Sequence, residues 1–287
     1  MCKLEKFTRL AFCLVATIFL GCNENDVQEV TVNDIQVSYR VYGDGYPLIM
    51  ITGLTATMDI WDPTVINELS ENYKVIIFDN RGMGLTTTGT ANFTIQQFAD
   101  DTAALMVALD IQKAHIFGWS MGTNVALKLI LSHPEMVNKL VLYAGDCGGP
   151  EVIEPSAEVQ NKMLSGDPGQ VFSTLFPEDW LAANIDYITD LFSSISTESS
   201  TEESLQKQLA AWQAWNESGV CSQLQGITNE VLLLTGDKDV CTPTANSTML
   251  EGLIPDSLLV QLSDGGHGIQ YQYPTDFSEA VLSFLNE

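Results

Sequence analysis

The sequence predicts an α/β protein with a mostly parallel sheet, an antiparallel start and flanking helices. Two observations carry this prediction. From Val27 onward, short aliphatic runs of the kind buried on both faces of a parallel sheet alternate with amphipathic helical segments. At the start, residues 30–41 alternate apolar and polar positions around Asn33-Asp34, which is typical of a β-hairpin. With 287 residues and 45% hydrophobic content, the chain can bury a sizeable core.

After the hairpin, the predicted strands are the aliphatic runs 47–51, 75–78, 114–117, 140–143, 231–234 and 258–262. Amphipathic spacing predicts helices over 94–109, 125–131 and 277–285.

The alternation of strand and helix breaks between residues 146 and 226. This stretch has no strand-like run and carries helical patches at 181–192 and 205–215. It contains thirteen acidic residues against two lysines. The sequence therefore predicts an acidic helical cap, inserted into an α/β domain that spans residues 30–287.

The first residues have the features of an export signal. Lys3, Lys6 and Arg9 precede an apolar run at 10–21, which is too short to span a bilayer as a stable helix. Gly21-Cys22 resembles a lipoprotein processing site. We expect residues 1–21 to be the signal, 22–29 a tether, and Cys22 to carry the lipid that anchors an exported protein to a membrane. Ordinary secretion and an uncleaved anchor remain alternatives.

The charge of the chain excludes a class of partners. The formal net charge is −25, and removal of the predicted signal takes away three bases and one acid, which leaves about −27. Phosphate backbones repel so many carboxylates, so we expect no nucleic-acid partner. The acidic cap indicates an entrance that disfavours anionic substrates at low salt, so a small neutral or cationic substrate is expected.

Three cysteines remain once the predicted signal and Cys22 are set aside. One disulfide and one free thiol is the simplest expectation, and a bridge between Cys147 and Cys221 would join the two ends of the insert. The alternative is that both, together with Cys241, are unbonded small hydrophobic residues. No pair has CxxC spacing, so we expect no metal site.

A candidate nucleophile lies in the pentapeptide 118–122, Gly-Trp-Ser-Met-Gly, between a predicted strand and a predicted helix. In this context the two glycines allow a sharp turn that projects the Ser120 hydroxyl from the end of the sheet. A serine hydroxyl needs a base, normally a histidine that is itself oriented by a carboxylate.

The sequence offers three histidines and three carboxylates for these roles. His115 lies inside a predicted strand and is expected in the core, and His133 is expected to end a helix. His267 lies in Gly-Gly-His-Gly just after a strand, where flanking glycines leave room for its ring to approach Ser120, so it is the predicted base. For the orienting carboxylate, spacing leaves three candidates open: Asp146, Asp237 and Asp239.

Four motifs in order resemble the α/β-hydrolase superfamily, especially its branch of 3-oxoadipate enol-lactonases, esterases and cofactor-free haloperoxidases. They are residues 79–84 (Asp-Asn-Arg-Gly-Met-Gly), 118–122, 236–239 (Gly-Asp-Lys-Asp) and 266–268 (Gly-His-Gly). The resemblance implies an eight-stranded, mostly parallel sheet with flanking helices and a helical cap. It points to Asp239 as the triad acid and to a structural role for Asp79 and Arg81.

The same resemblance implies the oxyanion hole. One backbone N–H comes from Met121, directly after the nucleophile, and the other from Leu54. This chain has Thr52-Gly53 where the family has His-Gly, and Thr123 where a second glycine is usual after the turn.

These observations predict a hydrolase of small esters or lactones that acts through a Ser120-His267-Asp239 triad and an acyl-enzyme, without cofactor or metal. Dehalogenases and epoxide hydrolases of this fold use an aspartate where Ser120 stands. The alternatives are a peroxidase or perhydrolase with the same triad, and a catalytically silent binding protein on a surface. The side chains expected to line the substrate site are Trp119, Trp180, Phe192 and Trp212.

Overall fold

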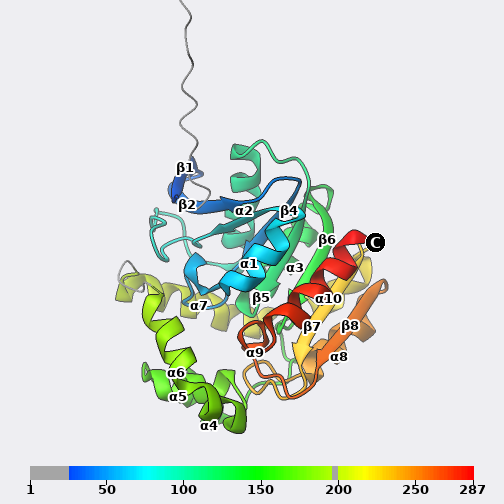
Figure 1. Cartoon of the computed structure of the whole chain (residues 1–287). Coiled ribbons are helices and arrows are strands. Elements are labelled where there is room, and N and C mark those ends of the chain that lie inside the picture. The colour runs from blue at the N-terminus through cyan, green and yellow to red at the C-terminus, as the bar shows by residue number, and fades with distance from the viewer. Residues whose placement is uncertain (1–25, 196–199) are drawn as a thin grey trace, which may run out of the picture.

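The computed structural model describes residues 26–195 and 200–287, which form an eight-stranded sheet with helices on both faces (Figure 1). The strands are β1 (Gln28–Val32), β2 (Ile35–Tyr42), β3 (Tyr46–Ile51), β4 (Tyr73–Phe78), β5 (Ala114–Trp119), β6 (Val137–Tyr143), β7 (Val231–Gly236) and β8 (Ser257–Leu262). Their order is β1-β2-β4-β3-β5-β6-β7-β8. The β1–β2 and β2–β4 pairs are antiparallel and the others parallel, as the sequence predicted.

The central strands are buried on both faces, which explains their continuous aliphatic sequences. Along β3, Leu48 and Met50 point to one core, and Ile49 and Ile51 to the other. The helices α1 (Pro63–Ser70) and α10 (Pro274–Asn286) cover the face of Leu48. The opposite face is covered by α2 (Ile95–Ala108), α3 (Met121–Ser132) and α8 (Ala245–Leu253). Short helix α9 (Ile269–Gln272) follows β8.

A cap of helices lies between β6 and β7, and in the described part of that segment there is no strand. Its helices are α4 (Ala157–Met163), α5 (Pro168–Leu175), α6 (Glu178–Ser194) and α7 (Glu202–Ser218), followed by a 3₁₀ helix at Cys221–Gly226. In Figure 1, α4, α5 and α6 lie together at one end of the molecule, away from the sheet. All of these helices lie between the end of β6 and the start of β7.

The N-terminal predictions fall largely outside the described residues. The expected signal (1–21) and Cys22 are among residues 1–25, which the structure does not describe. Strand β1 begins at Gln28, so the last two residues of the expected tether belong to the sheet. Among the described residues, no helix has the length and apolar character needed to cross a bilayer.

A disulfide joins Cys147 to Cys221 across a separation of 74 residues, and the described Cys241 is a buried free thiol. This pairing is the one that the positions of the cysteines suggested. The Val220 N–H also donates to the Cys147 carbonyl oxygen at 2.8 Å. The disulfide and this hydrogen bond therefore hold the two ends of the cap segment together.

Replacing Cys221 with serine is expected to lower the free energy of unfolding by about 4 kcal/mol, because the bond closes a long loop in the unfolded chain. Urea denaturation monitored by circular dichroism measures this change. The Cys147→Ser variant should lose the same amount, and the double variant no more than either single variant, since the bond can be lost only once. A loss below about 1 kcal/mol, or losses that add, would contradict this account.

Candidate active site

Ser120 sits on a sharp turn between β5 and α3. Its φ of 55° is in the left-handed region, and its side chain makes no capping hydrogen bond to the helix. The flanking glycines are needed for close backbone contact: a Cβ on Gly118 would lie 2.3 Å from the Gly122 carbonyl oxygen, and one on Gly122 would lie 2.2 Å from that of Ile51. The turn thus holds the hydroxyl away from the helix and at the end of the sheet.

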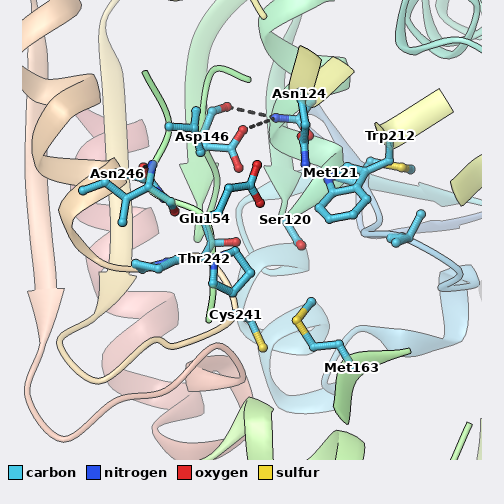
Figure 2. Close-up of a pocket in the computed structure, with 16 residues that line it drawn as sticks. Ser120, Met121, Asn124, Asp146, Glu154, Met163, Trp212, Cys241, Thr242 and Asn246 are labelled. Atoms are coloured by element: carbon cyan, nitrogen blue, oxygen red, sulfur yellow. Dashed lines mark hydrogen bonds between the residues drawn. The ribbon is translucent and has the colours of Figure 1, made fainter. Parts of the chain in front are cut away.

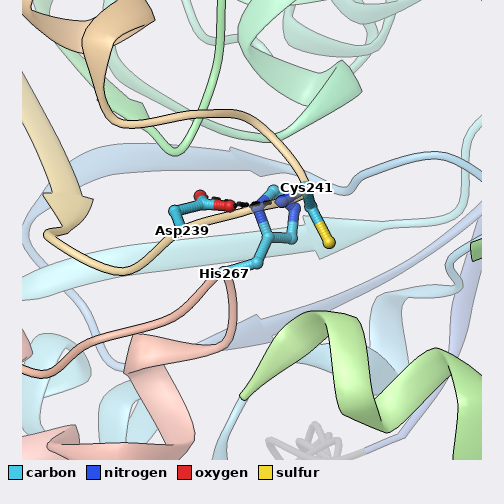
Figure 3. A group of neighbouring side chains, drawn as sticks. All are labelled: Asp239, Cys241 and His267. Carbon is cyan, nitrogen blue, oxygen red and sulfur yellow. Dashed lines mark hydrogen bonds and ion pairs between the residues drawn. The ribbon is translucent and has the colours of Figure 1, made fainter. Parts of the chain in front are cut away.

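His267 and Asp239 form a buried pair (Figure 3). The imidazole Nδ1 lies 2.8 Å from Asp239 Oδ2. The other carboxylate oxygen accepts the backbone N–H groups of Cys241 and Thr242, each at 2.9 Å. With Nδ1 engaged by the carboxylate, Nε2 is the ring nitrogen left for chemistry.

The two other carboxylate candidates lie elsewhere. Asp237 is exposed, two residues before the buried Asp239. Asp146 Oδ1 accepts hydrogen bonds from Asn124 Nδ2 at 3.1 Å and from the Gly148 N–H at 2.8 Å. Of the three, Asp239 is the one whose side chain contacts His267.

The glycines around His267 have a different use from the expected one. A Cβ on Gly266 would lie 2.4 Å from the Leu175 carbonyl oxygen, and one on Gly268 would lie 2.5 Å from the Phe176 ring. The absence of side chains at these two glycines therefore allows the end of cap helix α5 to pack against this loop, and the space is not filled by the imidazole. The imidazole itself lies beside Trp119, with ring centroids 5.8 Å apart.

The loop after β3 lies against the nucleophile. A Cβ on Gly53 would be 3.2 Å from Ser120 Cβ. Thr52, which replaces the family histidine, is fully buried, and its Oγ1 accepts a hydrogen bond from Asn80 at 3.2 Å. The cap helix α7 holds the next residues, because Gln208 Oε1 accepts the Thr55 N–H at 2.5 Å. The threonine is thus accommodated by polar contacts, and the cap supports the loop that carries Leu54.

Two cavities meet at Ser120. The larger, of about 350 Å³, has mostly apolar walls, and Ser120 and His267 both line it. The smaller, of about 30 Å³, is lined by Ser120 together with Leu54 and Met121, the expected oxyanion donors (Figure 2). As the first residue of α3, Met121 presents an N–H of the first helical turn, which has no partner within the helix.

The aromatic residues predicted to line the site separate into two groups. Trp119 and Phe192 line the larger cavity, and Trp212 lines the smaller one. Trp180 lies outside the walls of both and stacks on Phe176, with ring centroids 5.0 Å apart. The position of Trp180 shows why composition alone does not identify wall residues: an aromatic residue in a cap packs within the cap as readily as over the site.

The remaining motif residues are structural. The Arg81 side chain is fully buried and forms ion pairs with Asp101 and Asp34, each at 2.7 Å. Asp79 accepts the N–H groups of Met58 and Leu85, and its burial raises the pKa of the carboxyl to about 6. These contacts fix the turn after β4, in agreement with the role that the resemblance implied.

The other histidines lie away from Ser120. His133 ends α3 as its C-cap residue, as expected. His115 is in the core between the rings of Tyr46 and Tyr73, and its burial lowers the pKa of the imidazole to about 4. Its Nδ1 has no hydrogen-bond partner in the described structure, and the lowered pKa favours the neutral ring.

One group within the described chain has the composition of a metal site: Asp239, Cys241 and His267, whose potential ligand atoms lie within 4.8 Å of one another. Both carboxylate oxygens already accept hydrogen bonds, and burial raises the pKa of the Cys241 thiol, which disfavours the thiolate that binds metal. The geometry fits a hydrogen-bonded acid and base pair better than a metal centre.

Several residues at the site carry no signal in the sequence. Asn124, Glu154 and Cys241 line the smaller cavity, and Gln208 supports the loop beside it. They lie in the cap, in a helix and in a loop, and no motif joins them. Only the fold brings them together.

Comparisons with known proteins agree with this architecture. A family model described as the alpha/beta hydrolase fold matches residues 46–173. A protein of Caulobacter vibrioides named "Putative carbamate hydrolase RutD" is 28% identical, over 83% of this chain and 89% of its own length. An alpha/beta hydrolase fold protein from Chitinophaga pinensis superposes with a TM-score of 0.82 and 25% identity, covering 91% of this chain and 97% of that one.

The enol-lactonase of Burkholderia xenovorans, at 20% identity, has the same fold, with a TM-score of 0.77 over 91% of this chain and 100% of its own. The turn at Ser120, the sheet order and these matches agree with one another. The chain has the α/β-hydrolase fold.

Proposed function

We propose that the protein is a serine hydrolase of small carboxylic esters or lactones. The observation that carries the proposal is that Ser120 and His267 line one apolar cavity, while Asp239 holds the far side of the imidazole at 2.8 Å. A nucleophile, a base and an orienting carboxylate are thus supplied by three separate loops at one end of the sheet.

In the proposed reaction Ser120 Oγ attacks the ester carbonyl while His267 Nε2 takes the hydroxyl proton. The N–H groups of Leu54 and Met121 bind the oxyanion, and Asp239 stabilises the imidazolium that forms. His267 then protonates the leaving alkoxide, and the C–O bond breaks to leave an acyl-Ser120. Water attacks this acyl-enzyme with His267 as base, which releases the acid. With a lactone the alcohol remains on the acyl group, and the product is a hydroxy acid.

The size and walls of the larger cavity indicate that one half of the substrate is a small apolar group. Its volume of about 350 Å³ is at the lower end for small-molecule sites, and its walls include Ile60, Val171 and Phe192. A carbamate is a second candidate, because the same attack on a carbonyl would cleave it, and the Caulobacter relative bears the name of a carbamate hydrolase.

A panel of matched substrates tests the proposal. We expect the purified protein to hydrolyse short- and medium-chain 4-nitrophenyl esters or alkyl lactones without added peroxide, and kcat/KM to fall for acyl groups that overfill the cavity. An alkyl carbamate in the same panel decides between the two candidates. Product that forms only with peroxide and a carboxylic acid would identify a perhydrolase. Absence of turnover across the panel by the folded protein would overturn the proposal and leave a binding protein.

We also propose that the protein acts outside the cytoplasm, anchored by lipid on Cys22. The disulfide supports an oxidising compartment. Replacement of Cys22 with serine would then move the protein from the membrane to the soluble fraction, and an unchanged distribution would contradict the anchor.

A further inference from the structure

The two cavities that meet at Ser120 differ in chemistry. The larger one has mainly aliphatic and aromatic walls, whereas the smaller one combines polar and acidic side chains with apolar ones such as Val152 and Met163. Figure 2 shows the carboxylates of Asp146 and Glu154 in the smaller cavity, with the Trp212 ring on the other side of Ser120. The side chains of Asn124, Asn216 and Asn246 complete its polar wall. No lysine or arginine is among the described residues that line it.

The polar groups of this cavity are not all used within the protein. The amide of Asn246 has partners for both its oxygen and its nitrogen, since it exchanges two hydrogen bonds with the Ile153 backbone. In contrast, the buried Asn216 Oδ1 accepts no hydrogen bond from the described residues. An unpaired buried acceptor is costly, and either a water molecule or a donor on a bound ligand can satisfy it.

The pKa values of both carboxyl groups are raised. Glu154 is an exposed residue, but its partial burial, and then the negative charge of Asp146, raise the pKa of its carboxyl. Burial raises the pKa of Asp146 as well, although hydrogen bonds from Gly148 and Asn124 oppose this. Two acids that share a cavity with no cation are each less stable as anions than they would be in water. A positive group placed beside the two carboxylates would stabilise both of them as anions.

We propose that the smaller cavity is a subsite for a positively charged ammonium group on the substrate, opposite the apolar group held in the larger cavity. The carboxylates supply the charge, Asn216 Oδ1 an acceptor, and the Trp212 ring a face for cation–π contact. A neighbouring cavity of about 270 Å³ shares Glu154, Trp212 and Asn216 with it, so methylated ammonium groups also have space. This inference rests on the proposed esterase function, because it assigns the second half of that substrate.

The test uses a pair of esters that differ in charge and hardly in shape: choline butanoate and 3,3-dimethylbutyl butanoate. We expect wild-type kcat/KM to favour the choline ester by about tenfold, which corresponds to about 1.4 kcal/mol. The preference should shrink as ionic strength rises. Glu154→Gln and Asp146→Asn should each bring the ratio towards one. Because Glu154 is exposed, its variant should fold even if the Asp146 variant does not.

The matched control is Glu158→Gln, which removes the same charge from the cap. Glu158 lies outside the described cavity walls and pairs with Lys162, so the ratio and the activity should stay at wild-type values. A wild-type ratio near one, or a ratio that Glu154→Gln leaves unchanged, would overturn the inference.

A binding measurement separates failure of the subsite from failure of the esterase function. Titration calorimetry of the Ser120→Ala protein with choline and with 3,3-dimethylbutan-1-ol needs no turnover. We expect choline to bind more tightly, and Glu154→Gln to remove the difference. If neither ester is hydrolysed but choline still binds selectively, the proposed function fails and the subsite stands. Equal or absent binding of the two ligands overturns the subsite, whatever the outcome with the esters.

Discussion

Replacement of Ser120 with alanine is expected to lower kcat for ester hydrolysis by at least about 10⁴-fold, with little change in the free energy of unfolding. The hydroxyl supplies the atom that forms the acyl-enzyme, and what remains is catalysis by the oxyanion donors and by binding alone. The side chain makes no capping bond to α3, so its removal leaves the helix intact. Steady-state kinetics and denaturation of the same preparation measure both effects.

The control for this change is Ser132→Ala, at the other end of the same helix, where the residue is exposed. Its activity should match that of the wild type. The free thiol Cys241 lines the smaller cavity with Ser120 and is an alternative nucleophile, but burial raises the pKa of its thiol. Retention of more than about one tenth of the wild-type kcat by Ser120→Ala would contradict a nucleophilic role.

Replacement of Asp239 with asparagine is expected to lower kcat by about 10³- to 10⁴-fold. An amide in this place neither fixes the Nδ1–H tautomer of His267 nor stabilises the imidazolium. Its oxygen can still accept the N–H groups of Cys241 and Thr242, so the loop after β7 keeps its shape. The defect should therefore appear in kcat, with thermal stability close to that of the wild type.

Asp237→Asn provides a matched control, because it makes the same change two residues away on an exposed side chain. We expect wild-type kinetics for this variant. If Asp237→Asn were the more damaging of the two, or if Asp239→Asn lost less than about tenfold, the orienting carboxylate would have been assigned wrongly.

Much of the sheet could be predicted because each central strand is buried on both faces and must therefore be continuously aliphatic. The helix α1 was missed, although its start is marked: Asp62 caps it by accepting the Thr64 N–H at 2.8 Å, and Pro63 occupies its first position. The helix α8 was also missed. Its sequence, ANSTMLEGL, has three polar residues near the start, so the apolar spacing to which Leu250 belongs is difficult to recognise. Local pattern is weakest where few apolar residues define a helix.

The candidate site could be predicted only as far as motifs extend. The turn around Ser120 and the Gly-His-Gly segment are local sequence features. Spacing left Asp146, Asp237 and Asp239 open, the family resemblance pointed to Asp239, and in the fold the Asp239 carboxylate contacts the imidazole. The walls depend on how the cap packs, and no motif encodes this. Phe192 therefore faces the larger cavity while Trp180 stacks on Phe176, a distinction that the sequence does not contain.

The most direct test of a nucleophilic Ser120 is covalent capture. The native protein is incubated with a fluorophosphonate, digested and analysed by peptide mass spectrometry, with Ser120→Ala treated in parallel. We predict one adduct, on the hydroxyl of Ser120, loss of esterase activity in proportion to labelling, and no adduct in the alanine variant. A folded, active wild-type protein that carries no adduct on Ser120, or that is inactivated through another residue, would contradict the proposed mechanism.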